Sequence, residues 1–139
     1  ALNLAWETSF ICSREYPIRK VPVLGFKAVH FTKVKAEKVE ESGFKGVQIR
    51  WLVTKEDDAK NFAMRCFEIE PGGQSASHTH GWEHEVFILN GRCFVSCGDE
   101  GKEAGPGYVI FIPPDVPHYF KNLGNETLRF LCLIPYKER

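Results

Sequence analysis

The residues of this chain that are best suited to chemistry are its histidines. Three of the five, His78, His80 and His84, lie within the seven-residue stretch HTHGWEH. A fourth, His118, ends the proline-rich turn PPDVPH, whose restricted backbone suits a side chain that must be held still. Imidazole is the usual nitrogen ligand of divalent zinc, copper, iron and nickel. These residues predict a site for one divalent transition metal.

The alternative interpretation is that these histidines are surface or core residues, which is the common role of a single histidine. A cluster argues against it, because neighbouring imidazoles repel one another when they are protonated. On a strand, His78 and His80 would point to the same side, and Gly81 permits a bend that turns His84 back toward them. His30 stands apart in an early apolar run, and we assign it a structural role.

The elements that must position these residues have the pattern of short strands. Apolar runs of strand length alternate with turns rich in Gly, Pro and Asn, which predicts an all-β sandwich or barrel. The Asn90-Gly91 pair between two such runs predicts a hairpin. The expected strands are Val21–Phe31, Val47–Val53, Phe62–Ile69, His84–Leu89, Arg92–Cys97, Tyr108–Ile112, His118–Lys121 and Thr127–Ile134.

Two segments do not follow this pattern. Residues 1–20 have no sustained hydrophobic period and contain Pro17, which favours an N-terminal arm or edge strand. Lys33–Ser42 is the one stretch that could form a helix, although Val34 and Val39 alone give it a thin apolar stripe. We therefore expect an arm at 1–20 and a single β-barrel domain at 21–139.

Composition excludes several classes of function. The 139 residues suffice for one domain, and the 18 basic and 18 acidic side chains give no general field for nucleic acid. No apolar run of about 18 residues and no signal peptide are apparent, so we expect no membrane association. Five cysteines without a CxxC pair predict a cytoplasmic protein with reduced thiols. Cys93 and Cys97 are either a weak metal pair or, as we favour, part of strand packing.

Two motifs resemble those of the cupin superfamily. Residues 72–91, with the pattern GxxxxxHTH and a closing glycine, resemble the first cupin motif, and residues 107–122, with the pattern GxxxxxPxxxxHxxxN, resemble the second. The resemblance implies a double-stranded β-helix, also called a jelly-roll cupin barrel, with a metal inside one mouth. It also implies a homodimer, in which the N-terminal arm would be exchanged or paired at an edge.

The third ligand departs from the common cupin pattern. Most cupins have a glutamate at the position that His84 occupies here, with six residues between it and the closing Gly91. A shifted register would offer Glu85 instead, and we favour His84. Residues 61–65, 81–87 and 130–135 resemble the minimal four-histidine cupins that bind manganese. This resemblance implies manganese, while iron, nickel, copper and zinc suit the same ligands.

Strand alternation extends the metal site into a pocket. If His118 points inward, so does Phe120, and Phe130 shares a strand face with Cys132. In the four-histidine cupins that last face lines the metal cavity. The resemblance therefore implies that Phe130 limits access to the metal and that Cys132 is an oxidisable thiol near it.

Four further side chains have open roles. Arg65 is either an inward charge that orients an anionic substrate or a solvated residue, and Trp82 either forms the rim of the site or packs within its turn. Glu83 and Glu85 flank His84, so strand alternation turns both away from the metal. They either orient the ligand rings or lie in solvent.

Four neutral imidazoles leave two positions of an octahedral ion open for water, oxygen or an anionic ligand. We therefore expect a metal-dependent oxidoreductase, a dioxygenase that acts on a small organic substrate. Two alternatives stay open. One is a non-catalytic module that binds a metal or a small ligand. The other is a sugar or sugar-phosphate isomerase, which would need a basic phosphate pocket and usually the ligand glutamate.

Overall fold

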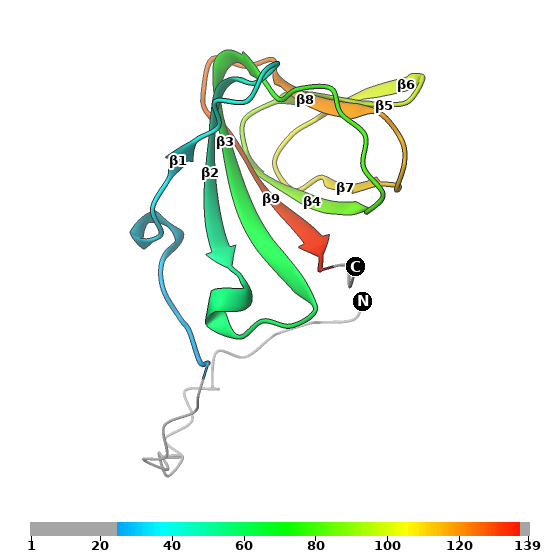
Figure 1. Cartoon of the computed structure of the whole chain (residues 1–139). Coiled ribbons are helices and arrows are strands. Elements are labelled where there is room, and N and C mark those ends of the chain that lie inside the picture. Colours follow the sequence, from blue (N-terminus) through cyan, green and yellow to red (C-terminus); the bar gives the residue numbers. More distant parts are fainter. Residues whose placement is uncertain (1–24, 137–139) are drawn as a thin grey trace, which may run out of the picture.

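A computed structural model describes residues 25–136 (Figure 1). Antiparallel strands dominate this part of the chain, and none of its helices has the length and apolar character needed to span a membrane. Its two 3-10 helices are η1 (Phe31–Lys33) and η2 (Lys55–Asp57). The strands are β1 (Glu37–Lys38), β2 (Lys45–Val53), β3 (Phe62–Gln74), β4 (His84–Asn90), β5 (Cys93–Cys97), β6 (Glu100–Ala104), β7 (Val109–Ile112), β8 (His118–Asn122) and β9 (Leu128–Pro135).

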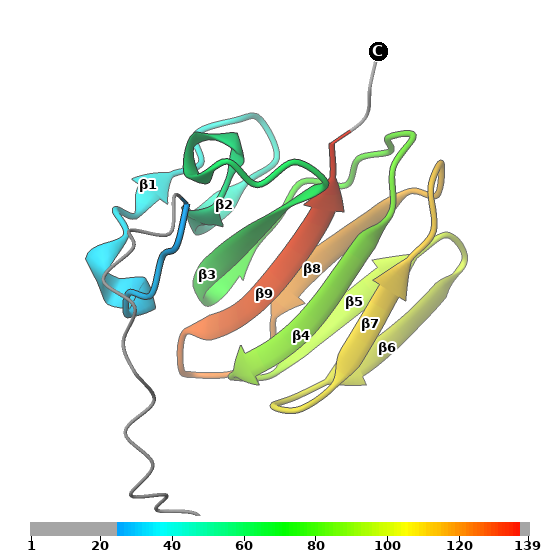
Figure 2. The ribbon, with the colours of Figure 1, turned by 90° about the horizontal axis from the view of Figure 1, so that it is seen from below.

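The strands form one curled sheet in the order β6-β5-β8-β3-β9-β4-β7, and β2 and β1 extend it from β3. The long strand β3 pairs with β2 and β9 along most of its length, and its last residue, Gln74, pairs with Lys121 of β8. Strands β9, β4 and β7 therefore face β8, β5 and β6 across a shared interior (Figure 1 and Figure 2). This arrangement confirms the predicted all-β jelly roll.

Alternate residues of each strand point into that interior, as the two-residue repeat of a strand requires. On β4, His84, Val86 and Ile88 are buried and the residues between them are exposed. His84 is the first residue of β4 and His118 the first of β8, so the packed interior fixes the strand ends that carry them. The buried core consists of Val47, Ile69, Val86, Ile88, Cys93, Val95, Ala104, Ile112, Phe120, Leu128, Phe130 and Cys132.

The predicted hairpin at Asn90-Gly91 is wrong. Strand β4 pairs with β7 and β9, whereas β5 pairs with β6 and β8, so the turn carries the chain from one side of the barrel to the other. The Asn90 side chain donates to the carbonyl of Thr127 at 2.8 Å. Gly91 has φ +85°, and a Cβ there would lie 2.9 Å from the backbone of Leu128. A glycine is therefore needed here, because the backbone at residue 91 lies close to the first residue of β9.

Two expectations near the N-terminus also need correction. The predicted strand at Val21–Phe31 has no strand in its described part, residues 25–31, where Phe26 and Val29 are exposed. The possible helix at Lys33–Ser42 is not formed either, and the segment holds only the end of η1 and the short strand β1. Too few apolar side chains were available for a helix to pack. The predicted arm at 1–20 lies outside the described residues.

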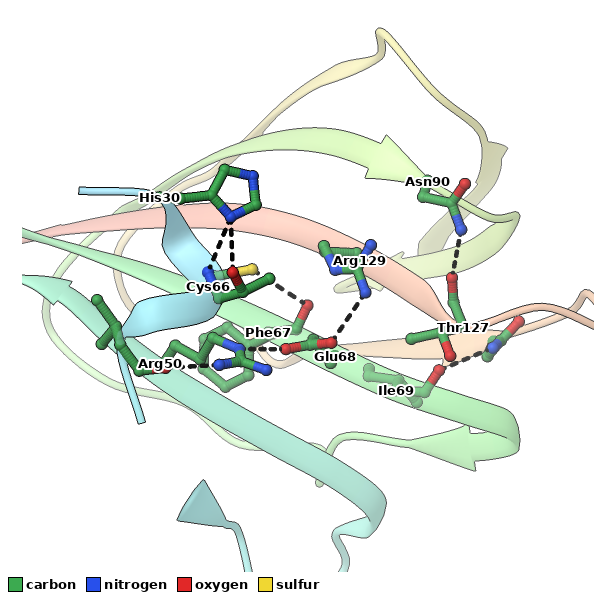
Figure 3. A network of polar contacts seen from close by, with 12 residues as sticks. His30, Arg50, Cys66, Phe67, Glu68, Ile69, Asn90, Thr127 and Arg129 are labelled. Carbon is green, nitrogen blue, oxygen red and sulfur yellow. Dashed lines mark hydrogen bonds and ion pairs between the residues drawn. The ribbon is translucent and has the colours of Figure 1, made fainter. Parts of the chain in front are cut away.

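An ion-pair network fastens this segment to the sheet. Figure 3 shows Glu68 of β3 between Arg50 of β2 and Arg129 of β9. Burial alone would raise the pKa of Glu68, but the hydrogen bonds from both arginines bring it below its ordinary value. Arg50 also donates to the carbonyl of Val34, and both guanidinium groups lie over the ring of Phe31, at 5.7 and 5.1 Å. From this anchor the chain continues into residues 37–42, which line the site.

The sequence did not predict β6. This strand, EGKEA, has only its last residue buried and pairs with β5 across a turn between Cys97 and Glu100. It lies at one end of the strand order. An edge strand with a solvent-facing polar surface has no apolar alternation, so the hydrophobic pattern gave no signal for it.

Asn122 is the buried polar residue on which the β8–β9 connection depends. Its side chain donates to the carbonyls of Ile69 and Glu126, at 2.9 and 2.7 Å, and accepts from Gly124 N–H at 2.8 Å. Asn122→Ala leaves these backbone groups unpaired, at a cost of about 1–3 kcal/mol for each buried one, so we expect unfolding to become easier by about 2–4 kcal/mol. Urea denaturation measures the change, with the exposed Asn125→Ala as the control. Equal stabilities of the two variants would contradict this role.

Candidate metal centre

The four predicted histidines come together inside the curled sheet. His84 and His118 begin β4 and β8, and His78 and His80 lie between β3 and β4. His78 and His118 form an isolated antiparallel bridge, with N–H···O distances of 3.2 and 3.1 Å. One nitrogen from each ring lies within 4.8 Å of those of the other three. His84 and His118 are 5% and 2% exposed, and the other two are more accessible.

Backbone carbonyls orient three of these rings. Nδ1 of His78, of His80 and of His118 each lies 2.8 Å from the carbonyl oxygen of a residue two positions away in the chain. A carbonyl oxygen only accepts, so each Nδ1 carries the proton and each Nε2 presents a lone pair. Nε2 of His118 is buried without a hydrogen-bond partner. The three rings are therefore in the tautomer that a metal ligand requires.

The ring nitrogens lie within 4.8 Å of one another, so they could surround one divalent transition metal after an adjustment of a few tenths of an ångström. A metal–nitrogen distance of about 2.1 Å separates nitrogens at right angles by about 3.0 Å and opposite nitrogens by about 4.2 Å. Nε2 of His80 lies 2.8 Å from Nε2 of His84. Two lone pairs at this distance repel each other unless a proton or a cation lies between them. The buried, unpartnered Nε2 of His118 points to the same conclusion.

The surroundings of His80, His84 and His118 favour the neutral form of these three rings. Burial lowers the pKa of His84 to about 3, and the positive charge of Arg65 adds to the effect. Burial also lowers the pKa of His80 and of His118, and the neighbouring imidazoles lower both further. A lowered pKa leaves the nitrogen lone pair available, so protons do not compete with a metal for these nitrogens near neutral pH.

His84 has hydrogen-bond partners for both of its neutral tautomers. Its Nδ1 lies 3.3 Å from Arg65 Nη2 and 3.3 Å from Cys132 Sγ. With the proton on Nε2, the ring donates to His80 and accepts from Arg65. With the proton on Nδ1, it donates to Cys132, and Nε2 is free to bind an ion. Cys132 is therefore the acceptor that the metal-binding tautomer needs.

The Cys132 thiol lies beside the histidines, as expected, in surroundings that keep it protonated. Burial raises its pKa, although the nearby Arg65 guanidinium acts in the opposite direction. A protonated, buried thiol is a poor nucleophile and reacts slowly with oxidants. The geometry gives Cys132 a role as hydrogen-bond partner of His84, and its oxidation stays a prediction.

A cavity of about 740 Å³ opens over the histidines, and the predicted pocket residues all line it. Phe120 and Phe130 stack within it, with ring centroids 4.8 Å apart. The ring of Trp82 stacks on His80, at 4.2 Å between centroids and 3° between planes, and forms a partly exposed rim. Arg65 points into the cavity, with Nη2 3.0 Å from Cys132 Sγ.

Sequence reasoning missed part of the lining. Trp51 and Phe67 line the cavity next to Arg65, and so do residues 37–42. Phe67 is two residues from Arg65 on the same strand, so strand alternation could have placed it. The position of residues 37–42 follows from the anchor at Arg50 and Glu68, a long-range contact with no local signal.

Several alternatives are decided by the fold. Glu85 is on the exposed face of β4, so it does not replace His84 as a ligand. The ring Nδ1 atoms bond to backbone carbonyls and not to Glu83 or Glu85. Cys93 is buried in the core, and the histidine cluster is the one group suited to a metal in the described part of the chain. His30 caps η1 through its Nδ1, which agrees with a structural role.

A protein-family model described as the cupin domain matches residues 65–134. The chain belongs to the cupin family. Among solved structures, the polyketide cyclase RemF from Streptomyces resistomycificus is 40% identical to this cupin, with 81% of this chain and 80% of that one covered and a TM-score of 0.76.

Two curated relatives are similar to part of this chain. The 1-methylthio-D-xylulose 5-phosphate methylsulfurylase of Rhodospirillum rubrum is 35% identical over 71 residues, which is 51% of this chain and 46% of that protein. The polyketide synthase CurC of Streptomyces cyaneus is 27% identical over 100 residues, which is 70% of this chain and 65% of that protein. This cupin spans about half the length of the curated relatives that it matches first.

The role of Cys132 as acceptor for His84 can be tested by substitution. Cys132→Ala removes the acceptor of the metal-binding tautomer, so we expect the affinity for Zn²⁺ or Co²⁺ to fall about tenfold. Cys132→Ser keeps an acceptor and should retain most of the affinity. Cys93→Ala is the matched control, because it removes an equally buried thiol from the core away from the histidines. Competition titration with a chelator measures the affinity. Equal affinities for the two alanine variants would exclude this role.

Proposed function

We propose that this cupin is a metal-dependent enzyme that binds a small, enolisable carbonyl compound at the four histidines. The observation that carries the proposal is that all four ring nitrogens face one cavity, whose volume of about 740 Å³ suits a small organic molecule. His78, His80, His84 and His118 would hold the ion through neutral imidazoles.

When bound, the divalent ion would supply Lewis acidity that polarises a carbonyl group and stabilises an enolate. The chain contributes the remaining conditions. Its neutral imidazoles leave the charge of the ion available to the substrate, and the rings of Phe67, Phe120 and Phe130 exclude water from the reacting groups. Arg65 adds a second positive charge in the same cavity.

The reaction class that we put first is an oxygen-independent carbon–carbon bond formation, such as a cyclisation. The names of RemF and CurC place both relatives in polyketide chemistry, and a chain of alternating ketones enolises readily. For the metal we keep manganese as the expectation from the resemblance. Imidazole is also a suitable ligand type for iron, nickel, copper and zinc. The affinity of such a site normally rises along the series from manganese to copper.

The dioxygenase reaction stays a prediction. The apolar wall of stacked Phe67, Phe130 and Phe120, with centroids 5.5 and 4.8 Å apart, would suit oxygen as well as an apolar substrate. A sugar-phosphate substrate is less well matched. The cavity is lined by one arginine and one lysine, Arg65 and Lys38, together with three glutamates, which do not make a phosphate pocket.

Activity is tested with protein loaded separately with Mn²⁺, Fe²⁺, Ni²⁺ and Zn²⁺ on a panel of β-dicarbonyl compounds. We expect turnover without oxygen, and a loss of at least about 100-fold in kcat/KM for His80→Ala because a metal ligand is removed. His30→Ala, which alters a histidine outside the cluster, should have no effect. Liquid chromatography with mass spectrometry follows the product.

An oxygen electrode run beside this assay separates the candidates. Turnover that requires oxygen would favour the dioxygenase over the reaction that we put first. A protein that binds metal and ligand but turns over nothing under either condition would be a non-catalytic binding module.

The homodimer implied by the resemblance is part of the proposal. The outer face of β4 and β7 exposes Phe87, Val109 and Phe111, and with Leu131 and Leu133 it lines an apolar hollow of about 420 Å³. A second copy of the chain would cover such a face.

A charge placed in this face tests the dimer. We expect Phe111→Glu to halve the mass measured by size exclusion with light scattering. Leu123→Glu, at an exposed apolar residue outside the hollow, should leave the mass unchanged. A monomeric mass for the unsubstituted chain would refute the dimer.

A further inference from the structure

Arg65 is a positive charge inside the cavity that no protein carboxylate balances. Arg50 and Arg129 pair with Glu68, and Arg92 pairs with Glu103, whereas Arg65 forms no ion pair with any residue among 25–136. Its Nη2 lies near the thiol of Cys132 and the ring of His84, and its Nε is buried without a hydrogen-bond partner.

The surroundings of this guanidinium hold it in place without neutralising it. Its Cζ lies 4.9 Å from the ring centroid of Phe67 and 5.7 Å from that of Trp51, so two aromatic faces support the cation. Three glutamates, Glu37, Glu40 and Glu41, line the same cavity, but all three are exposed and none forms an ion pair with Arg65.

Arg65 is half-buried, and a partly desolvated cation without a partner is costly because arginine keeps its charge. The four histidines add no negative charge, so a divalent ion held by them would give the cavity two positive centres that no carboxylate of residues 25–136 contacts. One imidazole ring, that of His84, lies between the guanidinium and the nitrogen that faces the ion. An anion that reaches both centres would satisfy the charge and the free guanidinium N–H groups together.

We propose that Arg65 binds the carboxylate of the substrate, and that the substrate is therefore a short oxo acid or a polyketone chain with a nearby carboxylate. This inference rests on the proposed function, since the carbonyl oxygen of the same molecule would occupy the open metal position. The guanidinium makes the carboxylate a specificity determinant. A neutral ketone of the same shape would leave Arg65 unpaired.

The test compares acetoacetate with methyl acetoacetate, which has the same carbonyl groups and no negative charge. Binding of each probe to the Co²⁺-loaded protein is followed by the visible absorption of the metal and by calorimetry. We expect acetoacetate to bind about tenfold or more tightly than the ester, because a charge-assisted hydrogen-bond pair is formed only with the acid. Arg65→Met should abolish this preference and leave the affinity for the ester within about twofold.

Two controls make the outcome decisive. Arg92→Met removes an exposed arginine outside the cavity and should keep the preference. Arg65→Lys keeps the charge without the forked geometry, so it should restore part of the preference. Metal content is measured for each variant.

Each remaining outcome contradicts a particular claim. Equal binding of acid and ester by the unsubstituted protein, or a preference that survives in Arg65→Met, would overturn the carboxylate role. A loss of Co²⁺ from Arg65→Met would also overturn it and would make Arg65 a residue that positions His84. If neither probe changes the Co²⁺ spectrum of the unsubstituted protein, the substrate does not bind at the metal. That result would refute the proposed function itself.

Discussion

The structure depends on the convergence of four imidazole nitrogens, which lie within 4.8 Å of one another. His80 and His84 approach to 2.8 Å between their Nε2 atoms, and Nε2 of His118 is buried with no partner. Burial lowers the pKa of His80, His84 and His118, and backbone carbonyls orient the rings of His78, His80 and His118 toward one centre. Without an ion, a proton on Nε2 of His84 bridges the rings of His80 and His84, whereas a shared cation would take the place of that proton. The rest of the barrel can be understood as the scaffold for this convergence.

The charge of the cavity follows from the same donor set. Histidines supply ligand atoms without negative charge, whereas the glutamate found in most cupins would neutralise part of a divalent ion. The place of that glutamate is taken by His84, and Arg65 beside it adds a further positive charge. This donor set is the basis of our proposal that an anionic or enolisable ligand supplies the missing charge.

Features that repeat along the chain could be predicted before the structure was known. The all-β class and most strand bounds follow from apolar runs between turns, and from His84 onward the strand bounds agree within one or two residues. The inward faces of Phe120, Phe130 and Cys132 follow from the two-residue repeat. The four histidines could be grouped because three are close in sequence and His118 ends a distinctive turn. Local backbone preference and alternation suffice for all of these.

What the amino-acid sequence alone determined is thus the strand pattern, the facing of side chains and the candidate ligands. The tertiary structure alone decided which strands pair, and so turned Asn90-Gly91 from an expected hairpin into a crossing between the two sides of the barrel. It also brought residues 37–42 to the cavity wall and placed the Cys132 sulfur against His84. These features rest on contacts between residues far apart in the chain, whose partners no local pattern specifies.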